Sequence, residues 1–377
     1  MQTIKTDGLD ILCWAMNPEE GAIEQAKNIA ALPFAHNHIA LMPDTHQGFG
    51  MPIGGVLAAV GHIIPNAVGV DIGCGMIATK TSLTEIDTAV LKNVLGGIRK
   101  SIPLGFNHRK EALDIEPVPK NAPIVADQHK KARFQVGTLG GGNHFIEFQR
   151  GSDGHIWFMV HSGSRNLGKQ VCDHYNRLAK EQSKDIPKNW DLAYLKADSV
   201  TGQQYIIEME YCLRFAKRNR DVMSQIISDI LQNETGAKVI DSVNIHHNYA
   251  NLEHHFGKDV WVHRKGATSA KAGQTGIIPG SQGTKSYIIK GKGNPLSFES
   301  CSHGAGRVMG RKQAERTLNL QEEIEKLDKL GILHGIRGIK DLDEAASAYK
   351  NIDVVMQEQQ DLADIAIELM PLGVIKG

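Results

Sequence analysis

The chain has 377 residues, and its 42 Lys and Arg balance 42 Asp and Glu, so the formal net charge is zero. This balance excludes a protein that coats nucleic acid by bulk electrostatic attraction, but it allows a local basic groove. No stretch approaches the roughly 20 apolar residues of a membrane span, and residues 1–7 lack the apolar segment of a signal peptide. Five cysteines without a paired spacing fit a reducing compartment, so we expect a cytoplasmic protein with no membrane association.

The first third of the chain predicts helices and strands separated by glycine-rich loops. Asn17 and Pro18 are followed by two acidic residues, a combination that favours a helix start. Residues 84–87 have the form of a capping box and predict a second helix start. In chain order, the expected elements are a helix over 17–31, a strand over 38–42, a polar loop over 43–50, an apolar glycine-rich run over 53–60 and a helix over 84–96.

The remainder predicts the same mixture. Residues 99–133 are basic and irregular, and we interpret them as a solvated loop, with a substrate-facing flap as the alternative. No repeat and no low-complexity linker divides the chain, which predicts a single mixed α/β globular domain over residues 1–377, of α+β class, with a mixed β-sheet core and surrounding helices. The other expected elements are a glycine-rich loop entering a strand over 137–148, strands over 156–160, 239–243, 260–262 and 286–290, and helices over 166–182, 204–232, 321–330 and 353–369.

The stretch over residues 69–76 carries the first chemical signal. Asp71 lies three residues before Cys74, among glycines that let the backbone turn tightly and approach a ligand closely. A soft thiolate beside a hard carboxylate suits a divalent metal ion. A glycine-rich turn with a small buried cysteine is the alternative interpretation.

Histidines recur in polar segments at the ends of predicted strands. A single histidine in such a place is more often structural, but several that converge on Asp71 and Cys74 predict a metal site. No C-x-x-C pair offers a closed tetrahedral set, so the mixture favours a catalytic centre for one or two Mn²⁺ or Zn²⁺ ions. The segments contain Asp44 and His46, Asn143 and His144, His161 and Arg165, His246 to Asn248, and Ser300 to Arg307.

Phosphate binding is the second theme. Residues 140–142, 280–283 and 303–306 are glycine-rich and can present bare backbone N–H groups to an anion, the last of them at a predicted helix start. None has the spacing of a Walker A loop or a Rossmann fingerprint. Together with the metal loop they predict phosphoryl or nucleotidyl transfer. The candidate cations for phosphate oxygens are Arg165, Arg264, Lys265 and Arg307.

Eight segments, in this order, resemble the RtcB family of RNA-splicing ligases. They are residues 43–48, 69–75, 140–145, 161–165, 247–248, 279–281, 302–307 and 374–377, so the resemblance extends from residue 43 to the last residue. It implies an RtcB-like fold and an enzyme that joins an RNA 2′,3′-cyclic phosphate or 3′-phosphate end to a 5′-hydroxyl end. GTP and two Mn²⁺ ions are the implied cofactors, and broken RNA, such as tRNA halves or cleaved ribosomal RNA, is the implied partner in tRNA splicing or RNA repair.

The resemblance also implies roles for single residues. Cys74 is implied as a thiolate that bridges two manganese ions, with Asp71, His144, His161 and His247 as the other ligands. His247 rather than His246 matches, because the family pattern is a histidine followed by an asparagine. His303 is implied as the nucleophile that becomes guanylylated before GMP passes to the RNA 3′-phosphate.

The resemblance assigns further residues around that nucleophile. Asp44 is implied to orient the imidazole of His303, and Arg165 and Arg307 are implied as clamps on substrate phosphates. Glu147 would accept two guanine N–H donors while Lys376 donates to guanine O6. The whole implied guanosine-nucleotide pocket comprises Asn143, Phe145, Glu147, Ser281, Ser286, Gly304, Ala305, Gly306, Tyr349 and Lys376.

Two positions depart from the family pattern, since Gln282 stands where methionine is expected and Asn166 where glycine is commoner. Neither removes a chemical group from the implied site. A metal-dependent cyclic phosphodiesterase or nuclease is the alternative enzyme, but it would leave His303 and Glu147 without a role. A non-catalytic RNA-binding scaffold is the alternative from another class, and the sequence shows none of the lost ligands expected for it.

Overall fold

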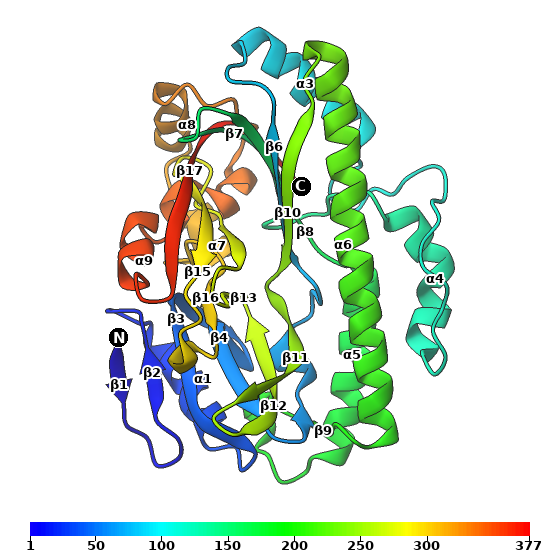
Figure 1. Ribbon diagram of the computed structural model, residues 1–377, viewed down its shortest axis with the longest axis vertical. Helices are drawn as coiled ribbons and strands as arrows, with labels where there is room; N and C mark the ends of the chain where they lie inside the picture. Colours follow the sequence, from blue (N-terminus) through cyan, green and yellow to red (C-terminus); the bar gives the residue numbers. More distant parts are fainter.

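The computed structural model describes residues 1–377 and contains two large β-sheets arranged along the long axis of the molecule (Figure 1). The strand order of the six-stranded sheet is β1 (Gln2–Ile4), β2 (Ile11–Cys13), β3 (Ala35–Phe49), β4 (Met51–Ala59), β12 (Lys258–Lys265) and β11 (Asn248–His255). The strand order of the seven-stranded sheet is β10 (Val239–His246), β6 (Gly75–Thr81), β8 (Ile156–Ser162), β7 (Phe145–Gly151), β17 (Ala363–Lys376), β15 (Ser286–Gly291) and β14 (Thr275–Ile278).

Helices surround these sheets, and the expected α+β class is confirmed. Two strand pairs, β13 (Ala267–Ser269) with β16 (Ser300–Ser302) and β5 (His62–Ile63) with β9 (Leu195–Lys196), complete the strands. No helix has the length and apolar character needed to cross a membrane. The α-helices are α1 (Glu20–Ala30), α2 (Pro65–Val68), α3 (Thr88–Ser101), α4 (Pro123–Gln135), α5 (Arg165–Gln182), α6 (Val200–Thr235), α7 (Arg311–Thr317), α8 (Leu320–Lys329) and α9 (Ile352–Glu358), and the 3₁₀ segments are Lys188–Trp190, Pro295–Ser297, Ile339–Glu344 and Ala346–Ala348.

The six-stranded sheet is buried on both faces. In β3, Ile39 and Leu41 point to the side covered by α1, whereas Ala40 and Met42 point to the opposite side, toward β15 and α9. Successive side chains of a strand alternate between faces, so an uninterrupted apolar run is what a strand with two covered faces requires. Burial of one large aliphatic side chain stabilises the fold by about 1.5–3 kcal/mol.

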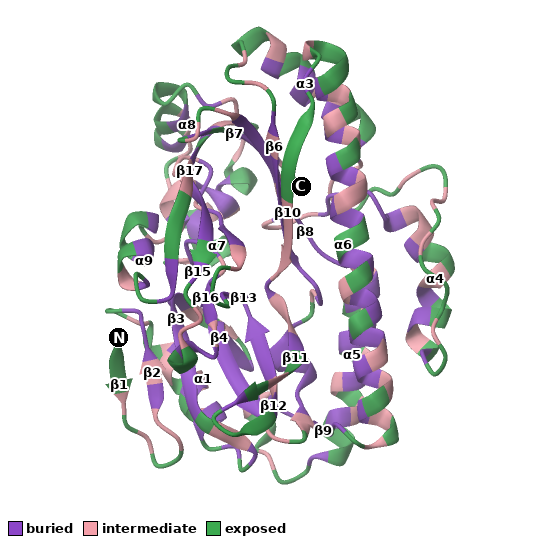
Figure 2. Cartoon of the chain, viewed as in Figure 1, coloured by how far each residue is buried: buried purple, intermediate pink, exposed green.

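The long helix α6 covers one face of the seven-stranded sheet (Figure 1). Its Met223 and Ile227 pack with Phe148 and Phe158 of the sheet, and buried and exposed residues alternate along the helix in Figure 2. The helix is capped at both ends, because the Ser199 side chain accepts a hydrogen bond from the Gly202 N–H and Gly236 adopts a φ of 76° at the C-cap. The observed helix is four residues longer at its N-terminus and three residues longer at its C-terminus than the expected helix over 204–232.

The C-terminal segment differs most from its prediction. We expected a helix over residues 353–369, but α9 ends at Glu358 and the chain then forms strand β17. This strand pairs with β15 on one side and β7 on the other. Large apolar residues recur at every second position, Ile365, Ile367 and Leu369, a period that suits a strand. Pairing to two neighbours then outweighs the helical propensity.

Several boundaries and two loops also differ. Helix α1 begins at Glu20 rather than at Asn17. Helix α3 begins at Thr88, with Asp87 as its N-cap, and ends at Ser101, whereas we expected a helix over 84–96. Residues 43–49 belong to β3, whose register shifts against β4 between Leu41 and Phe49, instead of forming a free loop. The basic stretch 99–133 contains helix α4 near its end. Propensity alone could not locate these limits, because tertiary pairing decides them.

Candidate active site

Four neighbouring strands bring the predicted metal ligands to one edge of the seven-stranded sheet. The strands β10, β6, β8 and β7 are antiparallel, so strand starts and strand ends alternate at the same edge. Cys74 directly precedes β6, His144 precedes β7, His161 lies near the end of β8 and His247 follows β10. In the register, Met76 and Phe145 both lie opposite His161.

The ligand atoms lie close together in this edge cluster. The Cys74 Sγ lies 3.2 Å from His161 Nε2 and 3.4 Å from His144 Nε2. The Nε2 atoms of His161 and His247 are 3.3 Å apart, and His144 Nε2 lies 3.0 Å from Asp71 Oδ2. The structure therefore brings together all five residues predicted as metal ligands.

The chemistry of this cluster fits a divalent metal ion. His144 Nδ1 lies 2.9 Å from the Leu139 carbonyl oxygen and His161 Nδ1 lies 3.0 Å from the Asn143 carbonyl oxygen, so each ring donates there and keeps a lone pair on Nε2. Burial and the neighbouring histidines lower the pKa of His161 and His247, which keeps both imidazoles neutral, the form that binds metals. Lone pairs aimed at one another and at a sulfur atom repel unless a cation lies between them.

The two remaining ligands support the same conclusion. Burial and the nearby Asp71 carboxylate raise the pKa of the Cys74 thiol, so the thiolate form requires a metal ion. The buried Asp71 Oδ1 has no hydrogen-bond partner within the chain. Gly163 leaves room for this carboxylate, because a Cβ on residue 163 would collide with it. Asp71 is thus held with an unpaired oxygen at the cluster, as a ligand would be.

Two buried residues of α6 hold in place the loops that carry the predicted metal ligands, and neither residue was predicted from the sequence. The Arg220 guanidinium donates to the carbonyl oxygens of Gly73 (3.0 Å) and Ser162 (2.8 Å), and thus joins the loop before β6 to the end of β8. The Asn219 side chain accepts from the backbone N–H of Gly137 at 2.7 Å and donates to the Gly163 carbonyl oxygen at 3.1 Å. The available signal was the run of five polar residues over 217–221, which interrupts the apolar stripe of the helix.

The predicted nucleophile and its partner meet across a long sequence separation. His303 Nδ1 lies 2.7 Å from Asp44 Oδ2, which also accepts the backbone N–H groups of His303 and Gly304. Burial alone would raise the pKa of Asp44, but the electrostatic attraction and hydrogen bond of the His303 ring, with help from Lys350, outweigh burial and hold that pKa below its usual range. Asp44 therefore stays ionised and fixes Nδ1 as the donor, so Nε2 carries the free lone pair.

The backbone after His303 forms a loop rather than a helix start. Helix α7 begins only at Arg311, so a helix dipole does not act on residues 303–306, contrary to our expectation. The N–H groups of Ala305 and Gly306 donate to no atom of the chain. Bare N–H groups in such a loop can still bind an anion.

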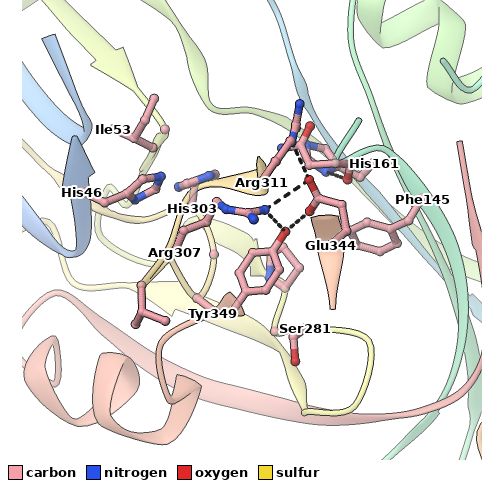
Figure 3. Close-up of a pocket in the computed structure, with 18 of the residues that line it drawn as sticks. His46, Ile53, Phe145, His161, Ser281, His303, Arg307, Arg311, Glu344 and Tyr349 are labelled. Carbon is pink, nitrogen blue, oxygen red and sulfur yellow. Dashed lines mark hydrogen bonds and ion pairs between the residues drawn. The ribbon is translucent and has the colours of Figure 1, made fainter. Parts of the chain in front are cut away.

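A cavity of about 610 Å³ opens beside His303 and reaches the metal ligands (Figure 3). His161, Arg307 and Tyr349 surround it in the figure, and the His303 ring lies 4.8 Å from the His247 ring. This volume suits a nucleotide-sized ligand. Of the residues predicted for metal, nucleophile, phosphate and nucleotide, the cavity is lined by Asp71, Cys74, Asn143, Phe145, Glu147, His161, His247, Ser281, His303, Gly304, Ala305, Gly306, Arg307, Tyr349 and Lys376.

Glu344 is a central residue of this cavity that the sequence analysis did not identify. Its buried carboxylate accepts from Arg311 Nε at 2.8 Å and from the Tyr349 hydroxyl, and it lies 3.2 Å from Arg307 Nη1 (Figure 3). Lys376 Nζ is 4.0 Å away. Burial by itself would raise the pKa of Glu344, but these cations hold it below the usual range. No motif marks Glu344, because its partners come from different parts of the chain, namely residues 307–311, Tyr349 and Lys376.

Four predicted residues lie elsewhere or are already engaged. Ser286 does not line the cavity, since its buried hydroxyl accepts the Gly280 N–H. Arg264 is fully buried in an ion pair with Glu253, and Lys265 donates to two backbone carbonyl oxygens, so neither is available as a phosphate clamp. The Arg307 guanidinium is bound by Glu344, Tyr349 and two carbonyl oxygens.

Arg165 has a different environment. Its guanidinium makes no ion pair, and its closest polar neighbours are Thr138 Oγ1 and His144 Nδ1, each at 3.4 Å. The backbone of Arg165 has a φ of 59°, a strained conformation for a residue with a side chain, and the guanidinium lies against the Cα of Gly140. A strained, unpaired arginine beside the predicted metal ligand His144 is suited to bind a phosphate.

The carboxyl group of Glu147, which lines the cavity, has an unusually high pKa. Burial raises the pKa of its carboxyl group to about 8, opposed by a 2.6 Å hydrogen bond from Gln149 Nε2 and by the charge of Lys376. In the nucleotide-free protein the group is therefore largely protonated at neutral pH. Two donors from a bound ligand would favour the ionised form.

We expect Glu147→Gln to stabilise the nucleotide-free protein increasingly as pH rises. The unfolded chain releases the Glu147 proton near the ordinary value of 4.5, whereas the folded chain retains it up to about pH 8. Wild-type stability therefore falls between these values by up to about 1.4 kcal/mol per pH unit, and glutamine removes this loss. Urea unfolding of both proteins at pH 5, 6.5 and 8 measures the difference. A difference that stays constant with pH would contradict the raised pKa.

Comparison with known proteins agrees with this geometry. The family model for tRNA-splicing ligase RtcB matches residues 25–125 and 117–377. The RNA-splicing ligase RtcB of Escherichia coli (strain K12) is 37% identical over 412 aligned positions, which cover 100% of this chain and 99% of the relative. The tRNA-splicing ligase RtcB of Thermococcus kodakarensis is 31% identical, covering 95% and 92%, and the RNA-splicing ligase RtcB of Mycobacterium tuberculosis is 31% identical, covering 94% and 100%. The chain therefore belongs to the RtcB family of RNA-splicing ligases.

Proposed function

We propose that this RNA ligase joins RNA 3′-phosphate or 2′,3′-cyclic phosphate ends to 5′-hydroxyl ends, with GTP as the energy source and two Mn²⁺ ions in the edge cluster. The observation that carries the proposal is the placement of His303. Its Nδ1 is held by the ionised Asp44, and its ring lies 4.8 Å from the ring of His247 in the metal cluster. A nucleotidyl-accepting nucleophile beside a metal site is what the ligase reaction needs, whereas a nuclease would have no use for it.

His303 begins the proposed reaction. Its Nε2 lone pair attacks the α-phosphorus of GTP, the phosphorus–nitrogen bond forms, and the bond to the β-phosphate oxygen breaks as pyrophosphate leaves. Asp44 stabilises the positive charge that develops on the imidazole. Manganese ions held by Asp71, Cys74 and the three histidines would supply neutralisation of the charge on the phosphate oxygens.

The RNA ends enter the proposed sequence after guanylylation. A cyclic phosphate must first be opened to a 3′-phosphate. GMP then passes from His303 to the 3′-phosphate, which becomes a mixed anhydride, and the 5′-hydroxyl of the second strand attacks it and releases GMP. We propose broken RNA, such as tRNA halves or cleaved ribosomal RNA, as the substrate. The five free, buried cysteines support a reducing, cytoplasmic location.

The proposed function is tested with α-labelled GTP, Mn²⁺ and the wild-type protein. The label should stay on the chain after denaturing electrophoresis, and added RNA with a 3′-phosphate should remove it. A strand with a 5′-hydroxyl end should then yield a joined product. Cleavage or cyclic-phosphate opening without protein labelling would support the nuclease alternative and overturn the ligase.

Glu147 and Lys376 are predicted to select the guanine base of the nucleotide. Glu147→Ala should reduce GTP-dependent guanylylation, because the guanine N–H donors would lose their acceptor. Deletion of Lys376 and Gly377 should reduce it as well, because the guanine O6 would lose its donor. Loss of a hydrogen bond to a charged group costs about 1.5–3 kcal/mol, so we expect a reduction of roughly 10- to 100-fold. Joining of an RNA already carrying a 3′-guanylate should be largely retained. Unchanged preference for GTP over ATP in both variants would place the guanine pocket elsewhere.

Arg165 is predicted to act on the RNA rather than on GTP. Arg165→Ala should reduce ligation more than guanylylation, because a clamp on a substrate phosphate is typically worth roughly 2–5 kcal/mol. Arg177→Ala is a matched control, since Arg177 lies on the same helix in an exposed ion pair with Glu181. Single-turnover rates of the two steps separate the effects. Equal losses in both steps would assign Arg165 to the nucleotide.

A further inference from the structure

A second cavity, of about 350 Å³, reaches the predicted metal ligands from another side. Of its wall, Arg165 has been proposed to bind an RNA phosphate, whereas the turn with Phe106 has no role in the steps described so far. The second cavity shares Asp71, Asn143 and Arg311 with the nucleotide cavity, so the two meet at the metal cluster. Its remaining wall includes His144, Arg165 and Lys169 together with the turn that carries Phe106. A ligand lying here would extend from the reacting phosphate away from the nucleotide.

Phe106 is the unusual member of this wall. Its side chain is 101% exposed, although it lines a cavity next to a metal ligand. The turn itself is firmly held, because the Asn107 N–H donates to the Leu104 carbonyl oxygen at 3.1 Å and Gly105 has a φ of 61°. The Gly105 N–H donates to the Gly140 carbonyl oxygen at 2.9 Å, which ties the turn to the loop before His144.

The placement of Phe106 contributes nothing to the core. Burial of a phenylalanine side chain would be favourable, and single exposed apolar residues are common on protein surfaces. Phe106, however, lies at the tip of an anchored turn with both ring faces free, at the mouth of a cavity that contains cations. An aromatic side chain has few rotatable bonds, so on an anchored turn it offers a stacking surface at little cost in conformational entropy.

The cations of this cavity suit a phosphate backbone. Arg165 has no ion pair, whereas Lys169 is paired with Asp173 and Arg311 with Glu344. Apart from Asp71, which faces the metal cluster, no carboxylate lines the cavity. One unpaired guanidinium beside an exposed aromatic ring is the combination by which proteins bind single-stranded nucleic acid, with phosphate on the cation and a base on the ring.

We propose that Phe106 is a positioning residue that stacks on an unpaired base close to the reacting end of an RNA strand, while Arg165 binds a phosphate of the same strand. The proposal rests on the proposed ligase function and names the part of the RNA that this second cavity takes. The shared ligand chemistry is a single-stranded terminal nucleotide, which the 3′-phosphate strand or the 5′-hydroxyl strand can supply. Stacking on Phe106 would hold that strand in line with the metal cluster.

Three substitutions test the nature of the contact. Phe106→Ala should raise the RNA concentration needed for half-maximal single-turnover ligation by about 10-fold, which is the effect of losing one stacked base. Phe106→Trp should restore wild-type behaviour, whereas Phe106→Leu, which keeps apolar bulk without a flat π face, should resemble Phe106→Ala. Phe256→Ala is the matched control, because Phe256 is a partly exposed phenylalanine in a turn outside both cavities.

An abasic substitution in the RNA identifies the stacked nucleotide and its strand. Wild-type and Phe106→Ala proteins are compared on RNAs that lack one base at a time, at the first three positions from the 3′-phosphate end and, in a second arm, from the 5′-hydroxyl end. At the stacked position, removal of the base should raise the half-maximal RNA concentration of the wild-type protein by about as much as Phe106→Ala raises it on intact RNA. The 10-fold difference between the two proteins should therefore disappear there and persist elsewhere.

The outcomes are distinct. Disappearance of the difference at a position in one strand supports the proposal and assigns that strand. A difference that persists at every abasic position, or Phe106→Leu behaving like wild type, overturns stacking. Phe106→Ala ligating like wild type overturns the proposal while the ligase function stands, whereas a wild-type protein that neither takes label from GTP nor joins RNA refutes the proposed function itself.

Discussion

Replacing His303 by alanine should abolish covalent labelling by α-labelled GTP and reduce ligation by at least about 10⁴-fold, because the reaction then lacks its nucleophile. The expected bond is a phosphoramidate, so the label on the wild-type chain should survive alkali and be lost in acid. Denaturing electrophoresis after each treatment measures it. The Nδ1 contact with Asp44 leaves Nε2 as the only ring atom that can form this bond.

Two further variants make this prediction specific. His254→Ala is the matched control, because His254 is exposed and pairs with Asp259 far from both cavities, so labelling should be unchanged. Asp44→Asn should keep the shape of the site but lose the charge that fixes the His303 tautomer, and labelling should fall by about 10²- to 10⁴-fold. Acid-labile label that remains on His303→Ala would assign the nucleophile to another residue.

Replacing Cys74 by alanine should remove guanylylation and ligation together, with at least about a 100-fold loss of metal affinity. Its sulfur lies within 3.4 Å of two histidine Nε2 atoms, so it is placed to be shared between two ions. Loss of a shared ligand weakens both ions, whereas loss of a terminal ligand weakens one. Metal analysis of the protein after gel filtration in Mn²⁺ measures the bound ions per chain.

Cys13→Ala is the control for this prediction. Cys13 is also a buried free cysteine, but it lies in β2 of the six-stranded sheet, away from the ligands. Its substitution should leave the metal content unchanged and cost only the packing energy of a small side chain. Two Mn²⁺ ions per chain in Cys74→Ala would show that the thiolate does not bridge them.

Local sequence was sufficient wherever a feature depends on neighbouring residues. The strand–loop segments that carry Asp71, Cys74, His144, His161 and His247 were identifiable because glycines, histidines and apolar runs follow one another at short spacing. The long helix α6 was predicted nearly to its ends, since its pattern is sustained and a serine and a glycine cap it. The RtcB resemblance likewise rests on short motifs in a fixed order, and the family match confirms it.

Features that join distant segments were decided only by the tertiary structure. Strand β17 replaced an expected helix because β7 and β15 offer hydrogen-bonding partners on both sides, a contribution that no local window contains. Glu344 and Arg220 carry no motif, yet each binds groups from several loops of the site. Arg264 looked like a phosphate ligand until its burial against Glu253 showed otherwise.

The amino-acid sequence by itself determined which chemical groups the site contains: a cysteine thiol, carboxylates and several imidazoles, among them that of the proposed nucleophile His303, on glycine-rich loops. Only the tertiary structure decided which of them meet, because the antiparallel order β10-β6-β8-β7 alternates strand starts and strand ends at one edge of the sheet. A separate contact, between β3 of the six-stranded sheet and β16, brings Asp44 to His303, 259 residues away. Side-chain chemistry is a local property of the chain, whereas proximity across hundreds of residues depends on strand pairing and core packing.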